Sequence, residues 1–307
     1  MNGLSPSPGL ERYRPQLSAA SARLTHEVTA IDERGRRSTL HIPAERPLTV
    51  YVDKRELVTL MTLGAAPEAL VLGYLRNQRL VRTLDDIVSV QVDWSVDAVA
   101  VVTRTGIADV EARTAKKVVT TGCGQGSVFG GLMDEVGNIV LPADARLTQS
   151  VVYRIVETIR TQQSVYKQSG SVHGCALFSN TGELLYFVED VGRHNAVDAI
   201  AGLMWLDGVI GADKVFYTTG RLTSEMVIKG AQMGIPFLLS RSGTTQMGHA
   251  VAGNIGMSLL ARCSGRHFLL LSGAERVVFE PALLDALESA RLVQMSASTS
   301  LQRELPP

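Results

Sequence analysis

The chain has 307 residues, 45% of them apolar and 20% charged, which is enough for one large or two ordinary globular domains. Its 30 basic and 30 acidic residues give a formal net charge of zero, which indicates no general attraction to nucleic acid or to an anionic membrane. The aromatic content of 5% argues against a surface on which nucleic-acid bases stack.

The N-terminal part of the chain predicts a tail followed by a small domain. Residues 1–23 are rich in Ser, Pro, Gly and Arg, so we expect a mobile tail. Two β-type runs, at 26–31 and 38–42, flank a turn-like segment and predict a hairpin. Residues 66–75 predict a helix, with Pro67 in its first turn. Further strands are expected at residues 48–52, 57–63, 87–94, 98–103 and 117–120. Residues 24–120 are therefore predicted to form a β-rich domain with one helix.

A glycine-rich loop around Cys123 follows this domain. Gly122, Gly124 and Gly126 have no side chains, so they leave the sulfur unshielded and permit unusual backbone angles. The lysines at 116–117 favour the thiolate, which is the nucleophilic form of cysteine. Cys123 is therefore the candidate nucleophile, and the alternative is a turn in which the cysteine is incidental. We expect residues 121–148 to contain this reactive loop and a linker.

The second half alternates between strands and helices, which predicts a layered α/β domain over residues 149–295 with a partly parallel sheet. The final residues, 296–307, form a polar tail. Helices are expected at 149–164, 195–205, 224–233, 245–255 and 282–293. Strands are expected at 172–178, 184–188, 214–218, 236–240, 258–261 and 267–271. The overall fold class is therefore α/β, or α+β when the N-terminal domain is included.

Polar residues follow several strands of this second half. Arg193, Arg221 and Arg241 lie at strand-to-helix junctions, with Ser242 and Thr244 as weaker members of the group. The ends of parallel strands share one sheet edge, and guanidinium groups match the geometry of phosphate. These junctions therefore predict a site for a sizeable anion. Lys229 is expected either at the same edge or in solvent.

Other polar residues of this half leave two interpretations open. Asp190, Asn195 and Asp198 fit helix caps or buried polar pairs as well as they fit ligand contacts. His194 suits an acid or base, although a histidine at a helix start is more often structural. We expect His173 to be buried and hydrogen-bonded, and Cys175 to belong to the core.

Several sequence features limit the chemistry and the compartment. The three cysteines, Cys123, Cys175 and Cys263, are too widely spaced for a disulfide framework or a Cys-x-x-Cys zinc site. The zinc-deaminase signature and the Walker-type phosphate loop are absent from the sequence, so we expect no metal held by protein side chains. No stretch has the pattern of a signal peptide or a membrane span, and we expect a cytoplasmic protein.

At this point a family resemblance emerges from the motifs. The chain resembles the FdhD family, the formate dehydrogenase accessory sulfurtransferases, over about residues 40–275. The motifs that carry the resemblance are Gly170–Leu177 (GSVHGCAL), Glu189–Asp198 (EDVGRHNAVD), Gly220–Lys229 (GRLTSEMVIK), Gly234–Pro236 and Ser240–Ser242, with weaker matches at Glu45–Leu48 and Leu72–Leu75.

The resemblance implies a sulfur carrier. Such a protein takes sulfur from a cysteine desulfurase as a persulfide on its loop cysteine, which Cys123 matches. It passes the sulfur to the molybdenum (or tungsten) bis(guanine dinucleotide) cofactor, bound as a substrate, before insertion into the formate dehydrogenase apoenzyme. The resemblance further implies a homodimer and a three-layer C-terminal domain similar to cytidine deaminases but without their zinc. The family's cofactor-contacting stretch matches Ala261, Arg262, Cys263, Ser264, Gly265 and Arg266.

The chain departs from the family pattern in two places. Many members have Cys-x-x-Cys in the loop, whereas Gly126 replaces the second cysteine here, so a disulfide relay within the loop is excluded. One thiolate still suffices to carry a persulfide. In the cofactor-contacting stretch, Ala261 and Cys263 stand where bulkier or basic residues are common.

The sequence thus predicts a two-domain sulfurtransferase with Cys123 as nucleophile. Arg193, Arg221, Arg241 and Arg266 are the expected phosphate contacts. One rival is a chaperone that delivers the cofactor without transferring sulfur, for which Cys123 is dispensable. A second rival is a nucleotide-modifying enzyme on a deaminase-like scaffold, which the absent zinc ligands disfavour.

Overall fold

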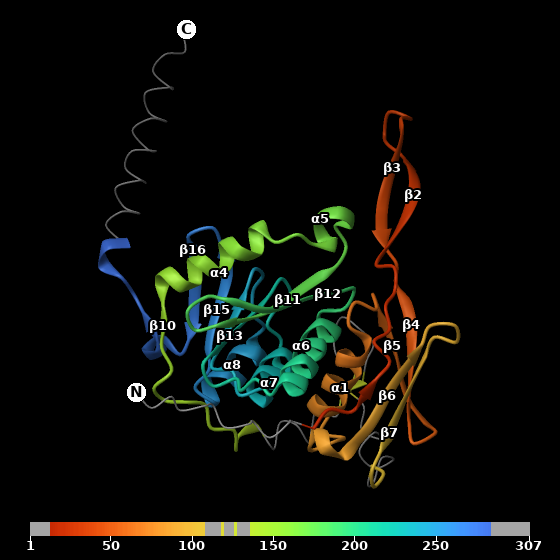
Figure 1. Ribbon diagram of the computed structural model, residues 1–307. Coiled ribbons are helices and arrows are strands. Elements are labelled where there is room, and N and C mark those ends of the chain that lie inside the picture. Colours follow the sequence, from red (N-terminus) through yellow and green to blue (C-terminus); the bar gives the residue numbers. More distant parts are fainter. Residues whose placement is uncertain (1–12, 108–117, 120–125, 128–135, 284–307) are drawn as a thin grey trace, which may run out of the picture.

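The computed structural model describes residues 13–107, 118–119, 126–127 and 136–283. Two sheets stand side by side with a pair of helices between them (Figure 1). One sheet is built by the N-terminal part of the chain and the other by the C-terminal part. The mixture of helices and several sheets confirms the predicted α/β, or overall α+β, class.

The N-terminal sheet has five strands in the order β1-β6-β7-β4-β5. Its strands are β1 (Gln16–Leu17), β4 (Arg46–Val52), β5 (Arg55–Thr62), β6 (Ile87–Asp93) and β7 (Ala98–Thr103). Alternate residues of β4, namely Leu48, Val50 and Val52, are buried, as expected of a strand with one face on a core. The helix α1 (Pro67–Asn77) begins with a proline, as predicted, and a single turn, η1 (Leu84–Asp86), leads into β6.

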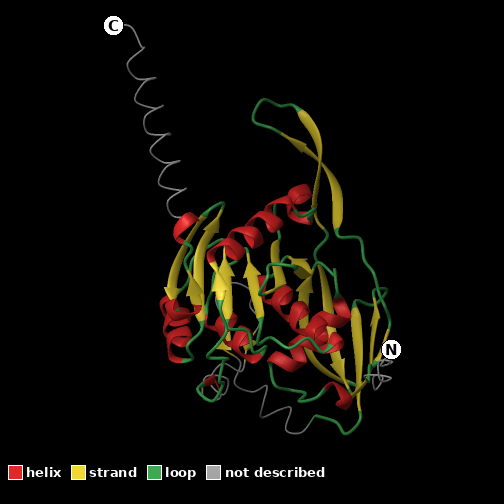
Figure 2. Cartoon of the chain, turned by 60° about the vertical axis from the view of Figure 1, so that its left-hand side comes forward, coloured by secondary structure: helices red, strands yellow, loops and turns green. Residues whose placement is uncertain are grey.

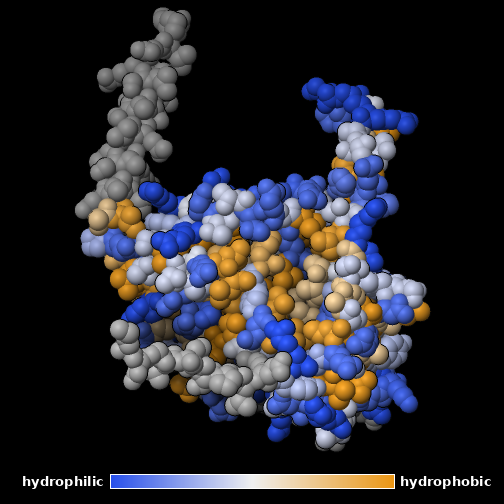
Figure 3. Space-filling model, viewed as in Figure 1, coloured by the Kyte–Doolittle hydropathy of each residue, from blue (hydrophilic) through white to orange (hydrophobic). Residues whose placement is uncertain are grey.

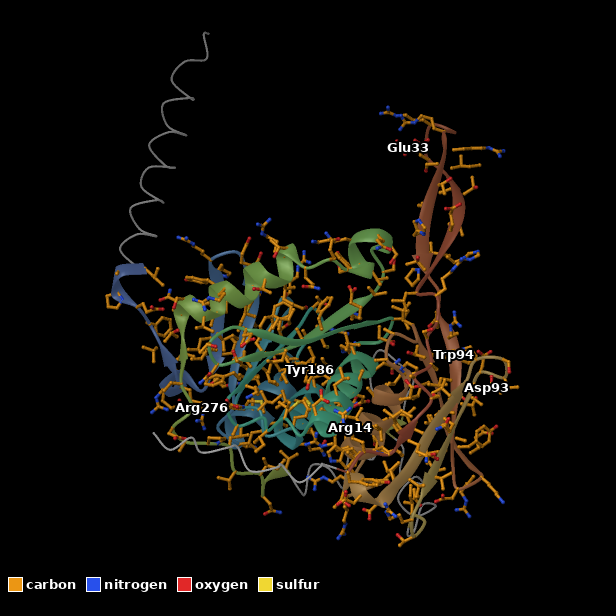
Figure 4. All side chains as sticks on the ribbon, in the orientation of Figure 1. Arg14, Glu33, Asp93, Trp94, Tyr186 and Arg276 are labelled. Carbon is orange, nitrogen blue, oxygen red and sulfur yellow. The ribbon has the colours of Figure 1, made fainter. Side chains whose placement is uncertain are left out.

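A long hairpin projects from this half of the molecule (Figures 1 and 2). It consists of β2 (Thr25–Ile31) and β3 (Arg37–Pro43), as predicted. The Asp32 carboxylate closes its turn by accepting hydrogen bonds of 2.9 Å from the Arg34 and Arg36 backbone N–H groups. The turn is strongly hydrophilic, and Glu33 marks its tip (Figures 3 and 4).

The C-terminal sheet has six strands in the order β12-β11-β13-β14-β15-β16. The strands β13, β14 and β15 are parallel, and the remaining pairs are antiparallel. The bounds are β11 (His173–Ser179), β12 (Leu184–Asp190), β13 (Lys214–Thr218), β14 (Phe237–Ser240), β15 (Ser258–Ser264) and β16 (His267–Ser272). The predicted parallel part is therefore present at the centre of a mixed sheet.

Helices cover both faces of this sheet. The helix α4 (Gln149–Thr161) packs on one face, against alternate residues such as Ala176 and Phe178 of β11. The helices α6 (Arg193–Asp207), α7 (Ser224–Gln232) and α8 (Gln246–Asn254) cover the other face, towards which Cys175 and Leu177 point. This alternation follows from the two-residue period of a strand and produces the predicted three layers. The likeness to cytidine deaminases stays a prediction.

Short elements complete the described chain. These are β8 (Val118–Val119), β9 (Gly126–Ser127), β10 (Leu147–Thr148), α5 (Val165–Ser169), η2 (Ala274–Arg276) and β17 (Val277–Val278). The strand β10 pairs in parallel with β17. The strands β8 and β9 pair with each other and flank the segment that contains Cys123. Of the helices in the described residues, none is long and apolar enough to cross a membrane.

Two close-packed helices join the halves. Gly73 of α1 and Gly202 of α6 lie at the crossing, where a Cβ on Gly73 would stand 1.7 Å from the carbonyl oxygen of Asp198. A Cβ on Gly202 would stand 1.9 Å from the carbonyl oxygen of Ala69. Apolar side chains from both sheets form one continuous core around these helices. This core joins the two halves, and the predicted division into residues 24–120 and 149–295, with a linker at 121–148, stays a prediction.

The expected mobile tail differs from the structure over residues 13–23. The strand β1 pairs with β6, and the Tyr13 hydroxyl donates to the Ile87 carbonyl over 2.7 Å. Arg14 forms an ion pair with Asp207, which also accepts a 2.7 Å hydrogen bond from Tyr186 (Figure 4). These partners are distant in sequence, so local composition does not reveal them. Residues 1–12 and the predicted tail 296–307 lie outside the described residues. Most of the predicted helix 282–293 also lies outside them.

Candidate functional site

Two adjoining cavities lie where the strands β13, β14 and β15 end. The wide cavity, of about 580 Å³, is lined by residues that include His173, Arg241 and Ser242. The narrow cavity, of about 290 Å³, has apolar walls that include Phe187 and Tyr217. Tyr166, Thr219 and Arg241 line both cavities. The predicted position of a ligand site, the carboxyl edge of the parallel strands, therefore does hold hollows.

The three strand-end arginines lie near this edge. Arg241 follows β14, and its backbone N–H donates to the Thr218 carbonyl over 3.0 Å. Arg193 is the first residue of α6 and is buried, with its stem packed where Gly220 has no side chain. Arg221 follows β13 and is exposed. Burial, and after it the charges of Arg193 and Arg221, lower the pKa of His173. Neither Arg193 nor Arg221 lines either cavity, whereas Arg241 lines both.

Ser242 and Thr244 have different surroundings. Ser242 lines the wide cavity, and its backbone N–H donates to the Ser240 hydroxyl over 2.9 Å. The Thr244 hydroxyl instead donates to the Leu222 carbonyl over 2.8 Å. Thr244 lines neither cavity and stabilises the loop before α8, so it is a poorer candidate for ligand contact.

The stretch from Ala261 to Arg266 reaches the site only in part. Cys263, Ser264 and Gly265 line the narrow cavity. Ala261 is buried in the sheet, whereas Arg262 and Arg266 are exposed and line neither cavity. Arg262 has a φ of 54°, in the left-handed region, at an irregularity in the pairing of β15 with β16. The residues that directly follow Arg262 are the ones that line the narrow cavity.

The two described cysteines are unsuited to nucleophilic chemistry. Cys175 is fully buried, as predicted, and its thiol donates to the Thr218 hydroxyl over 3.4 Å. Burial raises the pKa of Cys175 and that of Cys263 to about 12. Both therefore stay thiols at neutral pH, whereas the thiolate is the reactive form. Cys123 lies outside the described residues.

The charged residues of the EDVGRHNAVD motif hold the fold together, starting with Asp190. Its carboxylate accepts hydrogen bonds from the Thr62 hydroxyl over 2.5 Å, from the Leu63 and Gly192 backbone N–H groups over 3.1 Å, and from the Asn195 amide over 2.9 Å. Thr62 and Leu63 belong to the N-terminal half. Asp190 therefore binds the two halves together, and of its two open interpretations the structural one is favoured.

A buried cluster of charges continues this junction. Lys229 lies 2.8 Å from the Asp198 carboxylate and 3.5 Å from that of Glu225. The Asn77 amide donates to Asp198 over 2.7 Å. Burial alone lowers the pKa of Lys229, but the two carboxylates raise it above its ordinary value. Lys229 is 2% exposed, so both alternatives expected for it, the sheet edge and solvent, are wrong.

His194 borders the same cluster. Its Nε2 atom lies 3.2 Å from the Glu225 carboxylate, yet burial lowers the pKa of His194 to about 3. The imidazole is therefore neutral at physiological pH. It is 1% exposed and lines neither cavity, which favours the structural interpretation over acid–base chemistry.

Sequence reasoning missed three residues of the site. Tyr166 belongs to the short helix α5, which was not predicted. The Glu189 carboxylate stabilises the start of this helix, because it accepts hydrogen bonds from the Val165 and Tyr166 backbone N–H groups over 2.5 and 3.1 Å. Thr219 directly follows β13. His173 was expected to be buried, but it is only half-buried and lines the wide cavity. Within the described ranges, no group of three or more His, Cys, Asp or Glu residues is placed to hold a metal ion.

Comparisons with known proteins agree on one family. The model of the FdhD/NarQ family matches residues 43–278. A sulfur carrier protein FdhD of Listeria monocytogenes is 30% identical over 247 residues, which cover 77% of this chain and 91% of the relative. The sulfur carrier protein FdhD of Sulfurisphaera tokodaii is 33% identical over 241 residues, with the same coverage. A crystal structure described as a formate dehydrogenase accessory protein from Desulfotalea psychrophila superposes with a TM-score of 0.66 at 25% identity, covering 83% of this chain and 98% of that one.

Proposed function

Since the chain belongs to the FdhD/NarQ family, we propose that it is a sulfur carrier that serves a formate dehydrogenase. It accepts sulfur from a cysteine desulfurase and transfers it to the molybdenum bis(guanine dinucleotide) cofactor. The observation that carries this proposal is the family match over residues 43–278. That range includes Cys123, Arg193, Arg221 and Arg241. Two relatives of the chain, at 30% and 33% identity, are named sulfur carrier proteins.

Cys123 is the proposed point of sulfur attachment. Its thiolate attacks the terminal sulfur of the persulfide on the desulfurase. A new S–S bond forms at Cys123, and the desulfurase cysteine leaves as a thiolate. The pKa values of about 12 for Cys175 and Cys263 support this assignment, because those thiols are not ionised at neutral pH.

The two cavities are the proposed binding site for a guanine-dinucleotide end of the cofactor. Arg241 lines the wide cavity, which suits a diphosphate, and Arg193 and Arg221 are proposed to add positive charge near it. Phe187 and Tyr217 give the narrow cavity apolar walls, which suit the faces of a guanine ring. Because the cavities share lining residues, one ligand is able to occupy both.

Sulfur delivery requires only one cysteine in this chain. The cofactor, in a reduced form, donates an electron pair to the terminal sulfur and forms a new bond to it. The bond between that sulfur and the Cys123 Sγ atom breaks at the same time, and Cys123 leaves as a thiolate that regains its proton. Cys123 is the only cysteine that precedes Cys175 in the sequence, so no disulfide forms within the loop. The protein is a sulfurtransferase in this scheme. Its partners are the desulfurase, the formate dehydrogenase apoenzyme and a second copy of the chain, and it works in the reducing cytoplasm.

A cofactor chaperone without sulfur transfer is the alternative. The observation that favours it is the lining of the paired cavities, where Arg241 and apolar walls suit a guanine dinucleotide without any covalent step. Such a protein delivers the cofactor to the apoenzyme in the same way, but Cys123 has no function in it.

Formate dehydrogenase activity in cells that lack any other copy of this protein distinguishes the two. Cys123→Ser is expected to abolish activity while leaving protein levels unchanged. Cys175→Ala is the matched control, since it removes a buried thiol and is expected to retain activity. Full activity of Cys123→Ser would contradict sulfur transfer and favour the chaperone.

A further inference from the structure

The wide cavity contains a histidine to which the proposed function gives no part. His173 opens the strand β11 and is half-buried, with its side chain in the wall of the cavity. Its Nδ1 atom lies 3.4 Å from the Thr219 hydroxyl. Arg241 and Ser242 line the same cavity. The imidazole thus contacts Thr219 on one side and is available to a ligand in the wide cavity on the other.

Thr219 is held in place by the neighbouring residue, Gly174. The Thr219 backbone N–H donates to the Gly174 carbonyl over 2.9 Å, and the Gly174 N–H donates to the Thr219 hydroxyl oxygen over 3.0 Å. The hydroxyl therefore already accepts one hydrogen bond, and its own proton needs an acceptor. Among the described residues, His173 Nδ1 is the acceptor within reach.

The direction of this hydrogen bond decides which ring nitrogen carries the proton. When Nδ1 accepts a hydrogen bond from Thr219, the single proton of a neutral imidazole resides on Nε2. The charges of Arg193 and Arg221, together with burial, lower the pKa of His173 and keep the ring neutral at physiological pH. The ring therefore offers a directed N–H donor to the cavity, while the guanidinium groups supply the charge.

We propose that His173 binds the diphosphate of the guanine-dinucleotide ligand by donating a hydrogen bond from Nε2, and that Thr219 positions it by fixing this tautomer. This inference rests on the proposed function, because it takes the ligand from there. It adds a binding residue that neither the arginine pattern nor the stretch from Ala261 to Arg266 contains. The guanine ring, in the narrow cavity, does not depend on this contact.

Calorimetric titrations with GDP and with guanosine test the proposal. His173→Leu is expected to weaken GDP binding about tenfold or more, because a hydrogen bond to a charged group is lost. His173→Gln, whose amide places an N–H near the position of Nε2, is expected to retain most of the affinity. Guanosine affinity is expected to be unchanged in both variants, which also confirms that they are folded. His26→Leu, on the exposed hairpin, is the matched control.

Nitrogen NMR of the imidazole gives an independent readout that a merely structural role would not change. The wild-type protein is expected to show His173 protonated on Nε2, and Thr219→Val is expected to shift the ring towards a mixture of tautomers and to weaken GDP binding. A proton on Nδ1, or wild-type GDP affinity in His173→Leu, would overturn the proposal.

The outcomes separate this proposal from the proposed function. If wild-type protein bound no GDP, both the assigned ligand and the contact from His173 would be wrong. If GDP bound in a His173-dependent way but Cys123 took up no sulfur, the contact would stand and the sulfur-transfer function would fail.

Discussion

The crossing of α1 and α6 predicts that adding a single methyl group at Gly73 is severely destabilising. A Cβ on Gly73 would stand 1.7 Å from the Asp198 carbonyl oxygen, half of the 3.4 Å at which ordinary contact begins. It would also stand 2.8 Å from the Gly202 backbone nitrogen. Both obstructing atoms belong to the backbone, so no side-chain rotation relieves the overlap and the helices have to separate.

Two effects of opposite sign determine the magnitude for Gly73→Ala. Replacing glycine by alanine within a helix stabilises it by about 1 kcal/mol. Overpacking of a well-filled interior costs about 1–3 kcal/mol, occasionally more, and an overlap with two backbone atoms belongs at the upper end of that range. The steric effect therefore dominates, and we expect a net loss of at least about 2 kcal/mol in the free energy of unfolding, a large part of the usual stability of a domain.

Urea denaturation of the wild type, Gly73→Ala and Gly253→Ala measures this difference. Gly253 lies in α8, and nothing stands within 4 Å of the position that its Cβ would take. Gly253→Ala is therefore expected to be neutral or to stabilise the protein by up to about 1 kcal/mol. If Gly73→Ala unfolded at the same urea concentration as Gly253→Ala, the close approach of the two helices would be refuted.

Three further predictions concern the buried polar groups. Lys229→Met leaves Asp198 and Glu225 without their cation and is expected to cost about 3–5 kcal/mol in urea denaturation; a loss below 1 kcal/mol, within the scatter of surface substitutions, would argue against a buried ion cluster. The pKa of His194 is about 3 in the folded protein and 6.5 in the unfolded chain. The burial of the neutral imidazole therefore costs no stability above pH 6.5, and the folded state loses stability as the pH falls from 6.5 towards 3, because only the unfolded chain takes up the proton. Between pH 7 and pH 5 this loss is about 2 kcal/mol, and His194→Gln should remove it from the measured pH dependence. Asp190→Ala leaves four hydrogen-bond donors at the junction without their acceptor and is expected to lower the free energy of unfolding by about 3 kcal/mol or more. Thermal unfolding measures this loss, and an unchanged transition would show that Asp190 does not join the halves.

Most of the fold is predictable from local patterns. The alternation of Leu48, Val50 and Val52 marks β4, and Pro67 marks the start of α1. The strand β1 and the helix α5 were missed because they are short and depend on distant partners. Ser18, next to β1, donates to Glu68 over 2.5 Å, and Glu189 holds the first turn of α5. Such contacts join residues far apart in sequence and leave no local signal.

The site was predictable where topology alone places residues. Arg241 and Ser242 follow a parallel strand, and parallel strands end at one edge of the sheet. The burial of Lys229 was not predictable, because a lysine in a helix is usually solvated and its partner Asp198 belongs to another helix. The position of His173 in the cavity wall was not predicted, because its neighbours in the strand are apolar and indicate a buried residue. The strand nevertheless begins at the wide cavity.

Persulfide formation on Cys123 tests the central claim most directly. The protein and its Cys123→Ser variant are each incubated with a cysteine desulfurase and cysteine, and the intact masses are compared without reductant. The account predicts that the wild type gains the mass of one sulfur atom and that the variant gains none. An equal gain in both proteins, or no gain in a wild type that binds GDP, would contradict Cys123 as the sulfur carrier.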